Sequence, residues 1–273
     1  MLDPVPTPSV TAWEPLTPRG VAAFAHATSN RLFLVQFVVA VIVAGVAVWF
    51  LEDAWFPTVR QAILRLPAKG EIRAGTLNWP EDAPRLLAEG RFLSFSVDLN
   101  HSGEVRSPAH VQVEFARQDW RVRSLLGYVE FDYPTNVLAF NREALLPWWG
   151  AWRPQFLGLA ALATIGGLMA TWFGLALLYA GPIWLLVFYV NRDLRPVQCW
   201  RLAGAALMPG ALLMAVGILL YDVGVLDLVG LGFVTAGHFV LGWIYIFICP
   251  LFLPRLPQTG VTTKNPFAIP KRD

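Results

Sequence analysis

Residues 32–51 read LFLVQFVVAVIVAGVAVWFL, an apolar run in which Gln36 is the strongly polar residue. About 20 apolar residues in a helix span the hydrocarbon core of a bilayer. Arg31 precedes the run and acidic residues follow it. Its core is longer than that of a cleaved secretory signal, and it lacks a small-residue cleavage site. The run therefore predicts an uncleaved signal anchor, with transmembrane helix 1 over residues 31–51.

The composition of the whole chain agrees with a membrane protein. Of its 273 residues, 56% are hydrophobic and 15% are charged, against about 25% charged in a typical soluble domain. These values exclude a disordered chain and an ordinary cytosolic enzyme. Cys199 and Cys249 are too few for a disulfide framework or a zinc site. We therefore expect no metal and no cofactor.

Residues 52–153 differ sharply in composition from the rest of the chain. They contain 12 Lys and Arg and 13 Asp and Glu, which is more than half of all charged residues. About 100 residues can form a small core of their own. This block is predicted to be a separate extracytoplasmic domain, tethered at both ends.

Alternating apolar and polar residues predict that this domain is rich in β-structure. Such alternation is typical of half-buried strands, and it occurs in residues 91–99 and 110–117, with 71–79 and 128–133 as further candidates. Residues 56–66 and 141–149 are predicted to be short flanking helices. The expected fold of residues 52–153 is α+β, mostly β.

The segment 155–190 is long for one span and short for two. Residues 154–191 contain no charge, and 36 helical residues extend about 54 Å against a hydrocarbon core of about 30 Å. Cytoplasmic loops are enriched in Lys and Arg. The loop that follows carries Arg192, Arg195 and Arg201, whereas the next loop carries Asp222 and Asp227. These charges favour one crossing over 155–179 with an extension to 190; a hairpin is the alternative.

The remaining apolar runs complete the predicted topology. Further spans are expected over 202–221 and 229–253, and basic residues mark 255–273 as a cytoplasmic tail. Residues 1–30 are Pro-rich and predicted to be a disordered cytoplasmic tail. The fold class expected is an α-helical bundle of four transmembrane helices, within the membrane domain 154–254 and helix 1. The β-rich domain is inserted after helix 1, both termini are inside, and the location is the inner membrane.

Linear catalytic signatures are missing from the sequence. There is no G-x-S-x-G, H-E-x-x-H, G-x-x-x-x-G-K-[ST] or G-x-G-x-x-G pattern. The absence of these patterns favours a non-enzymatic protein, and an enzyme assembled from distant residues is the alternative. Asp98, His101, Glu104 and His110 have metal-ligand side chains, yet a polar loop between strands has the same composition.

Polar residues in the predicted spans are candidate site residues for a transporter or channel. His238 lies deep in the fourth span, with Tyr245 on the same helix, and ionisable groups in membranes are often functional. A neutral histidine can equally hydrogen-bond between packed helices. Helix breaks around a site occur in transporters, and kinks are also routine in membrane helices. The candidate breaks are Gly181 with Pro182 and Pro209 with Gly210.

Three arginines form a candidate contact patch in the external domain. Arg117, Arg121 and Arg123 could meet lipid phosphates or an acidic partner. A solvated hairpin that also contains Glu114 and Asp119 is the alternative, since Arg121 and Arg123 alternate with Val122 as on one strand face.

The order of the parts resembles a bacterial membrane family of unknown function that includes a maltodextrin-utilisation accessory protein. The residues that carry the resemblance are Leu66-Pro67, then residues 70–77 (GEIRAGTL), then residues 95–98 (FSVD). The resemblance implies one anchor helix, an external domain and a small Yip-like helical membrane domain. It implies no catalysis and no site residues.

Function is predicted only by class. The leading hypothesis is a non-enzymatic membrane accessory or assembly protein whose external domain binds a protein partner or envelope ligand. The alternatives are a transporter or channel component organised around His238, and a membrane enzyme acting on lipid or glycan. The expected partners are the lipid bilayer and a membrane or envelope protein, with no nucleic acid.

Overall fold

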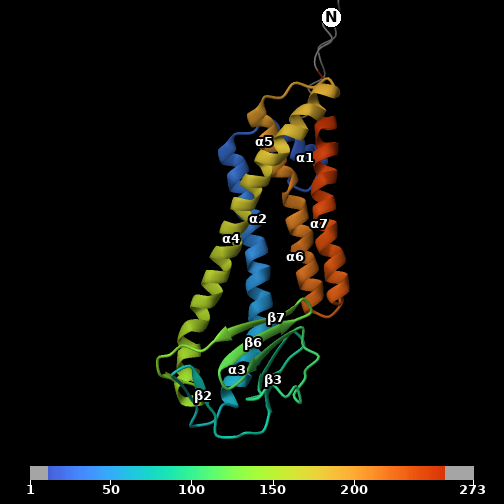
Figure 1. Ribbon diagram of the computed structural model, residues 1–273. Helices are drawn as coiled ribbons and strands as arrows, with labels where there is room; N and C mark the ends of the chain where they lie inside the picture. The colour runs from blue at the N-terminus through green and yellow to red at the C-terminus, as the bar shows by residue number, and fades with distance from the viewer. Residues whose placement is uncertain (1–11, 256–273) are drawn as a thin grey trace, which may run out of the picture. The chain divides into compact units, whose positions relative to one another are not determined.

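The computed structural model describes residues 12–255, which contain both helices and β-sheets (Figure 1). In this part of the chain, four helical segments are long and apolar enough to cross a membrane. They are Ser29–Leu64, Arg142–Tyr189, Pro196–Asp222 and Leu228–Phe252. The predicted combination of four membrane-type helices with a mixed α and β fold is confirmed at this level. Residues 1–11 and the tail from 256 lie outside the described residues.

The chain divides into two compact units. One contains the described residues up to 35, residues 172–209 and the described residues from 240 onward; the other contains residues 36–171 and 210–239. Several helices contribute residues to both units.

The N-terminal region is more ordered than its proline content predicts. Helix α1 (Pro18–Ala23) and the 3₁₀ turn η1 (Phe24–His26) precede helix α2 (Ser29–Phe50). The Thr17 side chain accepts a 3.0 Å hydrogen bond from the Gly20 amide, which is the role of an N-cap residue, and proline is favoured at the first helical position. The prediction that residues 1–30 are disordered is therefore wrong for 18–30.

Helix α2 continues into the second unit and leads into its β-rich part. A π-helical turn, η2 (Leu51–Trp55), joins α2 to helix α3 (Phe56–Leu64). The short helix predicted over 56–66 is thus present. Phe56 packs edge-on against Trp149 with ring centroids 4.9 Å apart.

Helix α4 (Arg142–Tyr189) is a single element of 48 residues (Figure 1). It begins where the Asn141 side chain accepts a 3.0 Å hydrogen bond from the Ala144 amide. Residues 141–149 are therefore the cap and first turns of α4 and not a separate short helix, and α4 runs on through the boundary predicted at 153. The helix runs through Gly181 and Pro182, so neither the predicted break nor a hairpin over 155–190 is present. Membrane helices tolerate proline without ending.

The other predicted break is close to a real interruption. Helix α5 (Pro196–Ala206) and helix α6 (Met208–Asp222) are separated at Leu207, two residues before Pro209, which has no N–H to continue the helical ladder. Helix α7 (Leu228–Ile248) and the 3₁₀ turn η3 (Cys249–Phe252) complete the described helices. These elements cover the spans predicted over 202–221 and 229–253, apart from Leu207 and Leu253.

Arginines cap helix ends in the first unit. Arg192 donates hydrogen bonds to the carbonyl oxygens of Leu251, at 2.9 Å, and Leu253. Arg201 donates to the carbonyl oxygen of Ala27. Basic side chains near the last carbonyls of a helix satisfy groups that have no intrahelical partner. Cys199 and Cys249 are buried as free thiols.

The β-structure lies in the second unit and forms two sheets. The smaller sheet has the order β2-β1-β8, from strands Thr76–Asn78, Glu71–Arg73 and Leu138–Ala139. The larger has the order β3-β4-β5-β6-β7. Its strands are Arg85–Glu89, Leu93–Val97, Val111–Phe115, Asp119–Ser124 and Gly127–Asp132. All neighbours are antiparallel except β4 and β5, so a long connection, residues 98–110, must return the chain to the start of β5.

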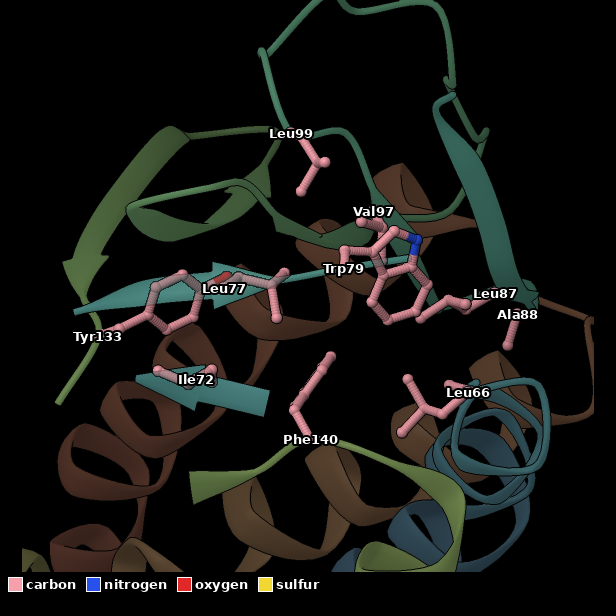
Figure 2. Close-up of a cluster of buried hydrophobic side chains, with 11 residues drawn as sticks. Leu66, Ile72, Leu77, Trp79, Leu87, Ala88, Val97, Leu99, Tyr133 and Phe140 are labelled. Carbon is pink, nitrogen blue, oxygen red and sulfur yellow. The ribbon is translucent and has the colours of Figure 1, made fainter. Parts of the chain in front are cut away.

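The hydrophobic core of this unit collects side chains from both sheets and α3. Trp79, Leu87, Val97 and Phe140 are among eleven buried residues that form one cluster, and Figure 2 shows their side chains converging. The Tyr133 hydroxyl, at the margin of this cluster, donates a 3.0 Å hydrogen bond to the Ala116 carbonyl oxygen. Burial raises the pKa of Tyr133, so the hydroxyl stays a neutral donor.

Helices α6 and α7 approach so closely that two positions on α6 require glycine. A Cβ atom at Gly210 would lie 2.7 Å from the His238 carbonyl oxygen, and one at Gly217 would lie 2.5 Å from a Val234 methyl carbon. Small residues allow membrane helices to pack this tightly. Gly210 is thus a packing residue, and the backbone of His238 is its contact.

We expect Gly210→Ala to destabilise the protein by about 1–3 kcal/mol, because the added methyl group meets a backbone atom that cannot rotate away. Gly232→Ala on α7 is the matched control, since a Cβ atom there has no neighbour within 4 Å. Thermal unfolding of the two purified variants in detergent measures the difference. Equal melting temperatures would show that α6 and α7 are not in close contact at Gly210.

Candidate functional site

The candidate site lies on the polar face of the five-stranded sheet, beneath the loop formed by residues 98–110. Strand register places Ser96, Glu114 and Arg121 side by side on this face. Ser96 and Glu114 are buried, although polar side chains on a sheet face usually contact water. The loop that links β4 to β5 supplies His101, which contacts Glu114.

His101 joins this loop to the sheet. Its Nδ1 lies 2.6 Å from Glu114 Oε1, and its Nε2 lies 2.8 Å from Asp119 Oδ1. The ring is therefore held between a carboxylate of β5 and a carboxylate of β6, one at each ring nitrogen. The left-handed backbone of His101, with φ of 53°, orients the ring into this position.

Asp98 organises the start of the same loop. Its Oδ2 accepts hydrogen bonds from the Ser102 hydroxyl at 2.9 Å and from the Gly103 amide at 2.8 Å. Burial raises the pKa of Asp98, but these bonds and those from the Ser102 and Asn100 amides outweigh burial and hold its pKa below the ordinary value. The buried carboxylate is therefore ionised and shapes the loop.

Asp119, which lies at the other ring nitrogen of His101, also has a lowered pKa. Burial raises its pKa, but hydrogen bonds with Glu130 and His101, and the charges of His101 and Arg121, outweigh burial and lower it. Opposite charges and hydrogen bonds to the ionised form act in this direction. Asp119 is an anion that needs its cationic neighbours.

The three arginines of the predicted contact patch are distributed over separate ion pairs. Arg123 lies 3.1 Å from Glu114, Arg121 lies 3.1 Å from Glu130 and 3.6 Å from Asp119, and Arg117 lies 3.5 Å from Asp82. This is the geometry of the alternative, a hairpin in which the arginines meet nearby carboxylates. Arg121 and Arg123 neutralise buried or half-buried acids, and Arg117 reaches an exposed one.

The chemistry of this network is structural. Buried charges are stable in proteins when they are paired and hydrogen-bonded. Glu114 contacts His101 and Arg123, and Asp119 contacts His101 and Arg121. Within residues 12–255, no group of three or more His, Cys, Asp and Glu side chains has a geometry that could hold a metal ion. Sequence reasoning missed the contacts of His101, because Glu114 and Asp119 are 13 and 18 residues away and no local pattern marks the crossover loop.

An open hollow lies next to the network, with a volume of about 470 Å³. It is bounded by the end of the 98–110 loop, the β6–β7 turn and the first residue of α7. The residues that line it include Arg106, His110, Gln112, Arg123, Leu125 and Leu228. Arg123 thus belongs both to the ion-pair network and to the wall of the hollow.

His110 belongs to an aromatic cluster that packs the sheet against helix ends. Its ring stacks on Tyr221 of α6 at 5.8 Å and 16°, and its Nδ1 hydrogen-bonds with the Tyr221 hydroxyl. Phe92 contacts both rings and also Phe50 at the end of α2, at 5.2 Å. Arg91 adds a 2.9 Å hydrogen bond to the Leu226 carbonyl oxygen. The loop and the helix ends therefore form one packed region.

The intramembrane candidates His238 and Tyr245 have separate partners. His238 Nδ1 lies 2.5 Å from the Thr235 carbonyl oxygen of the same helix. The Tyr245 hydroxyl donates to the Leu16 carbonyl oxygen. Each contact satisfies a polar group in an apolar stretch, as expected for side chains that support packing.

Comparison with protein-family models, curated proteins and solved structures finds no match to this chain.

We expect Asp98→Asn to lower stability by about 1–3 kcal/mol at neutral pH, because an amide replaces a buried charged acceptor. Since folding lowers the pKa of Asp98, its contribution is present above the unfolded-state pKa of about 3.9 and is lost as pH falls through the lower folded-state pKa. Denaturation followed by tryptophan fluorescence should show the gap between wild type and variant closing in acid. Asp82→Asn, with a side chain 94% exposed, is the control and should match wild type. A stability difference between wild type and Asp98→Asn that stays constant with pH would contradict the stabilising role of the ionised Asp98 carboxylate.

Proposed function

We propose that this chain is a non-enzymatic membrane accessory protein whose β-rich domain binds a protein partner at the free edge of its larger sheet. Strand β7 carries this proposal. It pairs with β6 on one side, it is the last strand in the sheet order, and all six of its residues are exposed. Edge strands with unpaired backbone groups are templates for a further strand.

The opposite edge of the same sheet is protected. Strand β3 has an irregular register between Leu86 and Ala88, and bulges of this kind disrupt edge pairing. Helix α3 packs on β3, and Arg65 donates a 3.0 Å hydrogen bond to the Leu87 carbonyl oxygen. The β3 edge is thus protected by its irregular register, by helix α3 and by the Arg65 side chain. Among the described residues, β7 has no comparable protection, and all six of its residues are exposed.

The side chains of β7 define the chemistry of the partner. Val129 and Phe131 lie on one face of the strand and are 58% and 42% exposed. Glu130 and Asp132 lie on the other face. We infer an extended protein segment with apolar residues opposite Val129 and Phe131 and a basic residue near the acids, because such cross-strand pairs stabilise sheets.

The distribution of charge supports an extracytoplasmic place for the β-rich domain. Arg195 and its neighbouring arginines follow α4, whereas the α6–α7 loop carries Asp222 and Asp227. By the positive-inside tendency, the proposal places both termini in the cytoplasm of an inner-membrane protein. The order of the parts, which resembles that of a bacterial membrane family of unknown function, is in line with this role. Transport around His238 and an enzyme acting on lipid or glycan stand as alternatives.

The partner proposal is tested by crosslinking in native membranes. A photo-crosslinking residue at Val129 should give a discrete protein adduct, and adding Glu130→Pro should abolish it, because proline cannot join a strand ladder. Val137, which is 61% exposed outside β7, is the matched position and should give no such adduct. Sequencing of the crosslinked peptide should identify an extended segment of another protein. Equal labelling at both positions, or an adduct that survives Glu130→Pro, would contradict the proposal.

Orientation is tested separately with single cysteines. Val137→Cys should react with a membrane-impermeant reagent in intact cells, whereas Arg195→Cys should react only after permeabilisation. The native cysteines are buried, and the parent chain treated in parallel gives their background. Labelling of position 195 from outside would reverse the orientation.

A further inference from the structure

We propose that the hollow beside His110 binds the phosphate headgroup of a phospholipid, with the Leu125-Leu126 tip of the β6–β7 hairpin lying among the neighbouring acyl chains. The lipid belongs to whichever leaflet faces the β-rich domain. The proposal therefore depends neither on the orientation of the chain nor on a partner for β7.

The hairpin tip is the first observation. Leu125 and Leu126 are 82% and 98% exposed, and they occupy the turn itself, where Gly127 adopts a φ of 118°. Turns between strands are usually built from polar residues, glycine and proline. Two adjacent leucines at a protruding tip indicate a surface that is covered in the working protein.

The position of the tip identifies that cover as the bilayer. Leu125 lines the same hollow as Leu228, and Leu228 is the first residue of a helix long and apolar enough to cross a membrane. Nearby, the Trp49 indole at the end of α2 donates a 3.0 Å hydrogen bond to Asp222, and tryptophan is enriched at membrane interfaces. The hollow consequently lies at headgroup depth.

The charge of the hollow fits a phosphate. Its lining contains Arg106 and Arg123 and no Asp or Glu. Arg123 is partly neutralised by Glu114, whereas Arg106 is exposed and makes no ion pair within the described part of the chain. Guanidinium groups bind phosphate oxygens with paired hydrogen bonds. Arg106 is therefore the principal phosphate ligand of the proposal.

A lipid explains both parts of the site, because it alone combines an anionic headgroup with acyl chains. A free phosphate would use the arginines and leave Leu125 and Leu126 in water. A protein partner at β7 would leave the arginine side of the hollow empty. The juxtaposition of an anion-binding wall with an apolar tip favours the amphiphile.

Membrane depth of the tip is the first measurement. The full chain carrying Leu126→Cys is labelled with an environment-sensitive fluorophore and reconstituted into vesicles of phosphatidylcholine and phosphatidylglycerol. Brominated lipids should quench the label at position 126 and leave a label at the Val137→Cys control unquenched. Equal quenching at the two positions, or none at either, would overturn the proposal.

Headgroup binding is the second measurement. Native mass spectrometry counts the phosphatidylglycerol retained by wild type, Arg106→Gln and Arg73→Gln, each checked for an unchanged melting temperature. Arg106→Gln should weaken retention about fivefold, the usual contribution of one basic residue near an anionic lipid surface. Arg73→Gln, exposed on β1 and outside the hollow, should match wild type.

The source of the phosphate is decided by competition with inorganic phosphate. Retention of phosphatidylglycerol that withstands inorganic phosphate supports the lipid. Complete displacement by inorganic phosphate, or equal retention by wild type and Arg106→Gln, would overturn the proposal in favour of a free-anion site or of no site.

Discussion

The packing of Phe92 against three other rings is the interaction on which the β-rich unit depends. Phe50 comes from the end of α2, Tyr221 from the end of α6 and His110 from the crossover loop. Aromatic pairs contribute about 0.5–1.5 kcal/mol beyond the area they bury, so four rings together fix the sheet beside the helix ends. The location of the hollow, of the hairpin tip and of the free edge all follow from that attachment.

Charge pairing is the second constraint. A parallel β4–β5 pair needs a long connection, and here the connection lies over the polar face of the sheet instead of forming a helix. That choice buries Asp98 and Glu114, which would be unstable without His101, Arg123 and the loop amides. The network around Asp98 and Glu114 thus holds the 98–110 loop against the sheet, and both carboxylates have hydrogen-bond partners.

Local patterns in the sequence predicted the elements better than their contacts. Period-two alternation located β4 and β5, and the apolar runs located the membrane-type helices. The proline content predicted disorder at residues 18–26, but Thr17 caps a helix there. The Gly181-Pro182 pair predicted a helix break, but α4 continues through it. The ion pairs of Arg121 and Arg123 follow from strand register, which alternation suggests. The position of His101 depends on one left-handed residue in a long loop, and no spacing rule encodes that.

The contacts of Phe92 also affect whether the β-rich domain can be produced as a separate fragment. A fragment cut at residues 56 and 141 would lose Phe50 and Tyr221 and would expose Phe92, in addition to the leucine tip and the β7 edge, which are exposed in the full chain. Exposed apolar edges promote self-association. The sheet has a core of its own, but Phe92 at its margin is covered by Phe50 of α2 and Tyr221 of α6.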